Sequence, residues 1–399
     1  MRWENKKLSD CCISIADGDH QPPPKADSGI PFVTIANISA TNQFDFSNTM
    51  FVPQEYYNRL DSKRKAQKDD ILYSVVGSFG IPVYMRETIP FVFQRHIAIL
   101  RPNESILPKF LYYTMLSRDF YMMADAAALG AAQRTISLTA LRNMKIAVPL
   151  MDIQKKIADI LSAYDDLIEN NQKQIKLLEE AAQRLYKEWF VDLRFPGHEN
   201  VKITDGVPEG WHVVKLSDVA DVNKTSISKQ YPYDYVDYVD LGSVSKGRIE
   251  TITRFSIQET PGRAKRVASD GDIIWGMVRP NLKSYALVFH PAATSVFSTG
   301  FAVLSAQKVP FSFLYCYVTQ DDFVGYLVNC TNGAAYPAVK PIHFEKATIM
   351  VPTDDLLKQF NLIAKPMYRK IEILEKQIQQ AKESRDRLLP KLMSGETEV

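Results

Sequence analysis

Apolar residues recur at intervals of three and four along two stretches of the chain, residues 153–189 and 356–392. This spacing puts them on one face of an α-helix and is typical of a seam between paired helices. Asp152 before the first stretch, and Thr353 to Asp355 before the second, can cap a helix and favour its positive end. We therefore predict two helices of roughly 38 residues, about 57 Å long at 1.5 Å per residue.

Helices longer than the diameter of a domain cannot be buried on that domain alone, so we expect these two to pack against each other. The apolar stripe predicts the positions at which they meet. The predicted helix-pairing seam consists of Ile157, Ile160, Tyr164, Ile168, Ile175 and Leu185 in the first helix and Phe360, Ile363, Met367, Ile371, Ile378 and Leu388 in the second.

The second half of the chain repeats the first. Residues 130–149 read GAAQRTISLTALRNMKIAVP, and 203 positions later residues 333–352 read GAAYPAVKPIHFEKATIMVP. The same offset continues through both predicted helices. A long period that occurs twice indicates a duplicated domain rather than a solenoid.

The segment before each helix is strand-rich, with short β-prone runs such as residues 70–76 and 91–100 between Gly, Pro, Asn and Asp clusters. We predict an α+β fold with two similar strand-rich domains, joined by two long helices that pair as an antiparallel coiled coil with pseudo-twofold symmetry. A parallel pairing stays open at this point. The predicted segments are residues 1–150 (first domain), 151–196 (central helix), 197–353 (second domain) and 354–399 (C-terminal helix).

The composition is that of an ordinary globular protein, with 46% hydrophobic residues and a formal net charge of +2. Neither domain is a strongly basic nucleic-acid binder, so partners would have to supply part of any grip on DNA. The N-terminus lacks a signal peptide, and no apolar run reaches the roughly 20 residues of a membrane span, so we expect a cytoplasmic protein. The four cysteines show no metal-ligand spacing, so we predict free thiols and no metal site.

On these residues the chain resembles the specificity subunits of type I restriction-modification enzymes. The resemblance covers nearly the whole chain and depends on the paired GAA segments, on Gln154-Lys-Lys-Ile, and on Asp69-Asp-Ile-Leu with its copy Gly271-Asp-Ile-Ile. It implies that each domain reads one half of a split double-stranded DNA sequence. It also implies two methyltransferase subunits docked along the helices, and two restriction-translocase subunits in the restriction form. S-adenosylmethionine would be bound by the methyltransferase, and no cofactor by this chain.

Base reading needs side chains with paired donors and acceptors, chiefly Arg on guanine and Asn or Gln on adenine. Polar loops near each GAA segment are the best candidates, with Lys, Ser and Thr better suited to phosphates. The predicted DNA-binding residues are Gln94, Arg95, Gln133, Arg134 and Thr135 in the first domain and Arg279, Asn281, Lys283, Tyr336 and Lys340 in the second.

The chain carries neither the Gly-rich cofactor loop and Asn- or Asp-Pro-Pro-aromatic motif of an adenine methyltransferase nor a GxxxxGK[ST] nucleotide loop. We therefore predict no catalytic residues and a DNA-recognition subunit that directs the chemistry of others. Two alternatives stay open: a specificity subunit whose partner is a fused methylase-nuclease, and a coiled-coil scaffold that binds proteins. The DNA sequence that is read cannot be derived, because loop geometry and DNA shape contribute to it.

Overall fold

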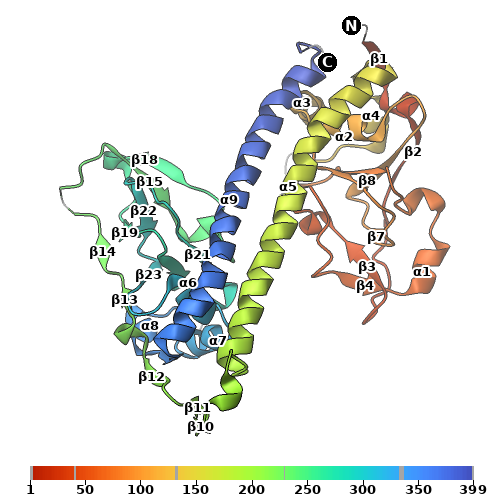
Figure 1. The fold of residues 1–399 in the computed structure, drawn as a ribbon. Helices are drawn as coiled ribbons and strands as arrows, with labels where there is room; N and C mark the ends of the chain where they lie inside the picture. The colour runs from red at the N-terminus through yellow and green to blue at the C-terminus, as the bar shows by residue number, and fades with distance from the viewer. Residues whose placement is uncertain (1–2, 40–41, 131–133, 229, 332–336, 398–399) are drawn as a thin grey trace. The chain divides into compact units, whose positions relative to one another are not determined.

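The computed structural model describes residues 3–39, 42–130, 134–228, 230–331 and 337–397. Its contacts divide the chain into two compact units (Figure 1). Unit 1 consists of Met1–Asn170 and Gln377–Val399, and unit 2 of Asn171–Lys376. The units cut across the four segments expected from the sequence, because each takes one half of each long helix.

Unit 1 is built on two sheets and one strand pair. The four-stranded sheet has the order β2-β8-β5-β6, the three-stranded sheet the order β4-β3-β7, and β1 pairs antiparallel with β9. The strands are β1 Glu4–Lys7, β2 Cys12–Asp17, β3 Ile30–Val33, β4 Met50–Val52, β5 Ile71–Ser74, β6 Pro82–Tyr84, β7 Val92–Phe93, β8 Ile97–Pro102 and β9 Lys145–Val148. The helices of this domain are α1 Gln54–Arg59, α2 Pro108–Leu116, α3 Arg118–Ala127 and α4 Leu138–Asn143.

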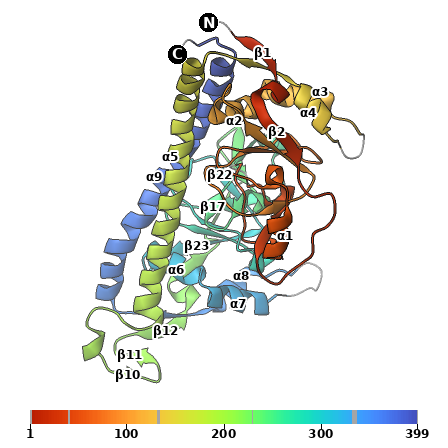
Figure 2. The same cartoon turned by 90° about the vertical axis from the view of Figure 1, so that its right-hand side faces the viewer.

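Strand β5 lies between two apolar clusters, which is why every one of its residues is buried. Successive side chains of a strand point to opposite faces. Ile71 and Tyr73 accordingly pack with residues of α2, α3 and the long helices, while Leu72 packs with Val33, Phe91 and their neighbours. Figure 2 shows α2 beside the first turns of α5 (Met151–Tyr186).

Unit 2 repeats this plan. Its four-stranded sheet has the order β13-β23-β20-β21, its five-stranded sheet the order β14-β19-β22-β15-β18, and β12 pairs antiparallel with β24. The strands are β10 Ile203–Thr204, β11 Val207–Pro208, β12 His212–Lys215, β13 Ala220–Val222, β14 Thr225–Ser226, β15 Tyr235–Val239, β16 Val244–Ser245, β17 Arg248–Ile249, β18 Thr253–Ser256, β19 Ala264–Val267, β20 Ile273–Gly276, β21 Tyr285–Leu287, β22 Ser295–Ser298, β23 Phe301–Ala306 and β24 Thr348–Val351. The helices are α6 Phe311–Val318, α7 Asp321–Asn329, α8 Pro341–Lys346 and α9 (Asp354–Met393), which continues into unit 1.

The repeated Asp-Ile motif has one structural role in both domains. The carboxylate of Asp70 accepts a hydrogen bond from the backbone N–H of Gln67, and that of Asp272 accepts one from Ser269, at 2.8 and 2.7 Å. Each bond closes the turn that precedes the central strand. Asp70 is also held by both arms of the Arg101 guanidinium, at 2.9 and 2.8 Å. This part of the resemblance therefore reflects folding rather than DNA contact.

The long helices pair antiparallel within each unit. In unit 1 the first turns of α5 share a core with the last turns of α9, since Ile157, Ala158 and Leu161 pack with Leu389 and Leu392. In unit 2 the last turns of α5 meet the first turns of α9. The ring of Tyr186 in α5 lies 6.2 Å from that of Phe360. The rings of Trp189 and Phe190, in the π-helical turn Lys187–Val191 that follows α5, lie 6.2 and 5.1 Å from it. The α+β class and the antiparallel pairing of long helices are thus confirmed, and the parallel alternative is wrong.

Most of the predicted seam is buried, but two of its positions are not. Ile160 is 37% exposed and Ile363 is 42% exposed, whereas their neighbours Leu161 and Ala364 are fully buried. Each helix packs on its own domain as well as on the other helix, which widens and rotates the buried stripe. Ile157, Ile168, Ile175, Phe360, Ile371 and Ile378 are buried, and Tyr164, Leu185, Met367 and Leu388 are partly buried.

The polar groups at and beside the two long helices differ between equivalent positions of the two units. In unit 1, Arg385 and Tyr113 both donate hydrogen bonds of 2.6 Å to the carboxylate of Asp165. The positions offset by 203 residues in unit 2 hold Ala182, Cys316 and Tyr368, and the Cys316 sulfur lies 3.0 Å from the Tyr368 hydroxyl. An ion pair in one unit is replaced by a neutral contact in the other.

The four cysteines are free thiols as predicted, and Cys11, Cys12 and Cys316 are buried. Burial raises the pKa of the Cys316 thiol to about 12, which keeps it protonated. Within the described part of the chain, no helix is long and apolar enough to cross a membrane.

Candidate nucleic-acid interface

In each unit, backbone hydrogen bonds connect the residues that follow the Gly-Ala-Ala triplet to the loop after the central strand, β5 or β20. We call this connection the joint. In unit 1 the N–H of Gly77 donates to the carbonyl of Arg134 at 3.1 Å, and the N–H of Ile136 donates to the carbonyl of Val75 at 2.9 Å. In unit 2 the N–H of Arg279 donates to Pro337 at 2.8 Å, and that of Val339 to Met277 at 2.9 Å. The joint brings together the loops in which the sequence placed most of its DNA-binding candidates.

A third loop completes this region in unit 1 and holds two of the predicted residues. The backbone of Val75 donates to the carbonyl of His96, and the Gln94 amide lies 2.7 Å from Nδ1 of the same histidine. Arg95 and Thr135 line a shared cavity of about 280 Å³. Its remaining lining residues are Asp17, Val75, Val76, His96, Ile136, Ser137 and Leu138. Gln94, Arg95 and Thr135 are thus brought together, as the DNA-binding prediction requires.

Arg134 has a structural partner in this loop. Its Nη1 lies 2.6 Å from a carboxylate oxygen of Asp125, and its guanidinium stands over the Phe79 ring at 5.7 Å. Phe79 in turn stacks on Tyr121, with ring centroids 5.7 Å apart. This contact fixes the loop on α3, so Arg134 holds the joint in place and its role toward DNA stays a prediction.

The acidic turn Asp17-Gly18-Asp19-His20 borders the cavity, although it was not predicted to belong to a DNA-binding region. Asp17 accepts from His20 at 2.8 Å, and Asp19 accepts from the Tyr56 hydroxyl at 2.7 Å. Arg64 lies 3.5 Å from Asp19. Burial and Arg95 lower the pKa of His96, so its imidazole is neutral at pH 7. The Asp-Gly-Asp-His sequence was visible, but its proximity to residues 94–96 depends on sheet order and could not be read from the sequence.

In unit 2 the predicted residues Arg279, Asn281 and Lys283 lie on one short 3-10 turn after β20. Arg279 and Asn281 are exposed. Lys283 pairs with Asp321 at 2.6 Å, at the start of α7. Lys340, also exposed, immediately precedes α8, next to the joint.

The two domains place their polar groups on different loops of the same framework. Gln94-Arg95-His96 of unit 1 corresponds in the strand register to Ser298-Thr299-Gly300 of unit 2. Conversely, Arg279 to Lys283 of unit 2 corresponds to Gly77-Ser78-Phe79-Gly80 of unit 1. One framework therefore presents two unlike surfaces. The candidates Gln133 and Tyr336 lie outside the described residues.

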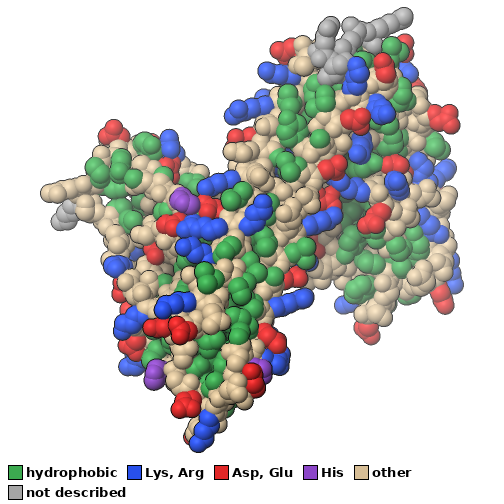
Figure 3. All heavy atoms as spheres, in the orientation of Figure 1, with side chains coloured by type: hydrophobic (Ala, Val, Ile, Leu, Met, Phe, Trp, Pro, Cys, Tyr) green, Lys and Arg blue, Asp and Glu red, His purple; other side chains and the backbone are tan. Residues whose placement is uncertain are grey.

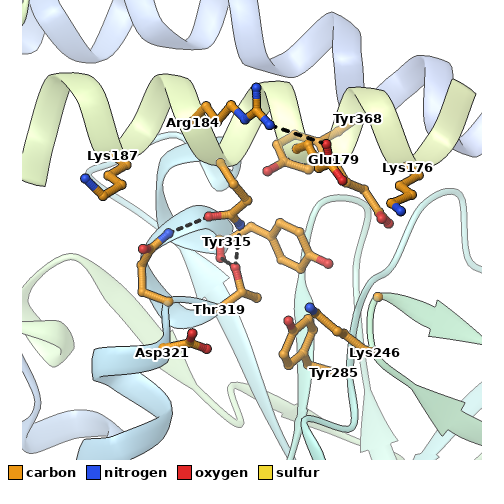
Figure 4. A pocket seen from close by; sticks show the side chains of 14 residues that line it. Lys176, Glu179, Arg184, Lys187, Lys246, Tyr285, Tyr315, Thr319, Asp321 and Tyr368 are labelled. Atoms are coloured by element: carbon orange, nitrogen blue, oxygen red, sulfur yellow. Dashed lines mark hydrogen bonds and ion pairs between the residues drawn. The ribbon is translucent and has the colours of Figure 1, made fainter. Parts of the chain in front are cut away.

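A larger cavity, of about 470 Å³, lies elsewhere in unit 2, between α5 and the domain (Figure 4). Tyr285, Tyr315 and Tyr368 form its inner wall, and Lys176 of α5 and Lys187, the first residue after α5, stand near its mouth. Burial raises the pKa of Glu179 inside it. This cavity contains none of the predicted DNA-binding residues, and its size does not make it the recognition site.

Hydrophobic side chains are exposed on both long helices, among Lys and Arg residues (Figure 3). Leu177, Leu362 and Ile373 are 64%, 76% and 49% exposed. Such residues lie on surfaces available to a partner. Among the described residues, no group of three or more His, Cys, Asp or Glu side chains could hold a metal ion.

Comparison with known proteins identifies the family. Residues 2–180 match the model of the type I restriction modification DNA specificity domain. The whole chain aligns with 94% of the type I restriction enzyme MjaIX specificity subunit of Methanocaldococcus jannaschii at 26% identity. It aligns equally with the putative MjaX specificity subunit of the same organism at 24% identity. Residues 2–180 thus match the specificity domain of this family, and the full chain is similar to type I restriction enzyme specificity subunits.

The fold agrees with this family. The crystal structure of a type I restriction-modification S subunit from M. genitalium superposes with a TM-score of 0.62 at 15% identity, over 98% of this chain and 96% of that one. The type I restriction enzyme HindI specificity subunit from Haemophilus influenzae matches a smaller part, at 30% identity over 40% of this chain and 37% of its own length. The resemblance predicted from the sequence is confirmed by the specificity-domain match and by the full-length relatives, and the solved structure supports the fold.

Proposed function

We propose that the chain recognises a split double-stranded DNA sequence, with one domain reading each half, and directs partner subunits to that site. The observation that carries the proposal is the repeated joint with unlike polar loops. A duplicated framework supplies two equivalent reading positions, and the exchange of Gln94-Arg95-His96 for Ser298-Thr299-Gly300 supplies two different specificities. An asymmetric bipartite sequence suits such a molecule.

In this proposal the chain is a non-catalytic subunit. Two methyltransferase subunits, which bind S-adenosylmethionine, modify adenine at the site, and up to two restriction-translocase subunits join them. The formal net charge of +2 supports a need for such partners, because few phosphates can be neutralised by this chain alone. The exposed apolar residues of α5 and α9 offer these partners a surface.

A gel-shift assay with the purified methyltransferase complex tests the proposal. The duplexes to test carry the sequence that is methylated in cells expressing the complex. They should be retarded at protein concentrations at which scrambled duplexes are not, in the presence of competitor DNA and at a stated salt concentration. Equal retardation of both duplexes would exclude sequence recognition and favour a protein-binding scaffold. A partner that cleaves DNA as well as methylating it would identify the fused methylase-nuclease system instead.

A further inference from the structure

Two residues that flank the 3-10 turn after β20 occupy backbone conformations that favour glycine. Arg279 has φ of +49° and Lys283 has φ of +55°. Side chains with a Cβ adopt this left-handed region only rarely, because the Cβ crowds the following carbonyl oxygen. Such an outlier persists only when the surrounding structure enforces it, and it is found most often at functional sites.

The first domain shows what the same framework does without these side chains. The Gly77 N–H makes the bond to the GAA segment that Arg279 makes in the second domain, and Gly77 has φ of +72°. Gly80 occupies the place of Lys283, with φ of +89°. The fold accepts glycine at both positions, so Arg279 and Lys283 are not required by the turn.

The two cations differ in their exposure to solvent. Lys283 is partly buried, and its ammonium is neutralised by Asp321 of α7 at 2.6 Å. In the first domain a Cβ at Gly80 would lie 2.6 Å from the Tyr121 ring, and Val324 stands in the place of that tyrosine in the second. Lys283 therefore fits as a brace between the loop and α7.

Arg279, by contrast, is exposed, and the residue after it is Pro280, whose fixed φ stiffens the turn. Its backbone is bound to the GAA segment, so the base of the side chain is held in place. An arginine on a rigid loop presents paired donors that match O6 and N7 of guanine.

We propose that Arg279 is a specificity-determining residue that reads a guanine in the half-site of the second domain, with Lys283 as the brace of its loop. The proposal rests on the function proposed above. The first domain, with glycine at the equivalent place, reads its own half-site through the loop of Gln94 and Arg95.

The test is the methylation motif of cells that express the full-length chain with its methyltransferase. Arg279→Gly introduces the residue that the first domain has at this place, Gly77, so the Tm of the variant should be unchanged or raised by about 2–4 °C. Its motif should lose discrimination at one G·C pair, in one half only. Arg279→Asn, which also tolerates the left-handed region, should do the same. Leu282→Ala, at an exposed position of the same turn, is the matched control and should keep the full motif.

Other outcomes would overturn the proposal. An unchanged motif in Arg279→Gly, with affinity reduced uniformly across sequences, would make Arg279 a phosphate contact. Relaxation of the same base pair by Leu282→Ala would assign the effect to loop shape. A wild-type chain that yields no split motif would instead contradict the proposed function itself, so the two failures can be told apart.

Discussion

Arg385 and Asp165 are 220 residues apart in the chain, yet the guanidinium Nη1 lies 2.6 Å from the carboxylate Oδ1. The pair connects the last turns of α9 to α5 inside unit 1, and both side chains are largely buried. It explains why a charged residue interrupts the apolar stripe of α9. The N-terminal domain consequently depends on residues near the C-terminus of the chain.

Removing one partner of this pair should destabilise unit 1. Arg385→Ala leaves a mostly buried carboxylate that keeps its hydrogen bond from the Tyr113 hydroxyl, and breaking a buried pair costs about 3 kcal/mol. Urea denaturation should show this loss in the free energy of unfolding, whereas Arg387→Ala, at an exposed position of the same helix, should change it little. Equal effects of the two variants would mean that the ion pair does not hold the helices together.

Glu375 should make stability depend on pH in the neutral range. Burial, assisted by Glu179, Glu250 and Glu372 and opposed by Arg248, raises its pKa to about 7. The unfolded chain then loses this proton near pH 4.5 while the folded chain keeps it until about pH 7. The free energy of unfolding should therefore fall as pH rises from 5 to 8.

The matched variant is Glu375→Gln, which cannot titrate. Chemical denaturation of the full-length chain at pH 5 and pH 8 should show a smaller pH-dependent loss in this variant than in the wild type. His96, whose folded pKa is lowered, contributes with the opposite sign in both proteins and cancels in the comparison. Identical pH dependence in the two proteins would disprove a perturbed Glu375.

The long helices should set the number of unread base pairs between the half-sites. Deletion of residues 171–177 and 374–380 removes one heptad from each helix and shortens the spacer by about 10 Å. The unread gap of the methylation motif should shrink by up to roughly 3 base pairs. Sequencing of modified bases in cells carrying the deletion measures this gap directly, and an unaltered gap in an active complex would show that the helices are not the ruler.

The sequence predicted elements whose pattern is local. The central and C-terminal helices were predicted to begin at residues 151 and 354, and α5 and α9 begin at Met151 and Asp354. Ile160 and Ile363 were assigned wrongly because a stripe of threes and fours does not reveal that each helix also packs on its own domain. The equivalence of Gly77 and Arg279 was hidden as well. It is defined by backbone conformation and strand register, and these cannot be predicted from two side chains as different as those of Gly and Arg.

The central claim is that each domain reads its own half of the DNA sequence, and a domain exchange tests it most directly. Residues 1–149 are replaced by the corresponding domain of another specificity subunit, and the methylation motif is sequenced in cells that supply the methyltransferase. The account predicts that one half of the motif changes while the other half and the gap stay the same. A motif that changes in both halves, or in neither, would contradict it.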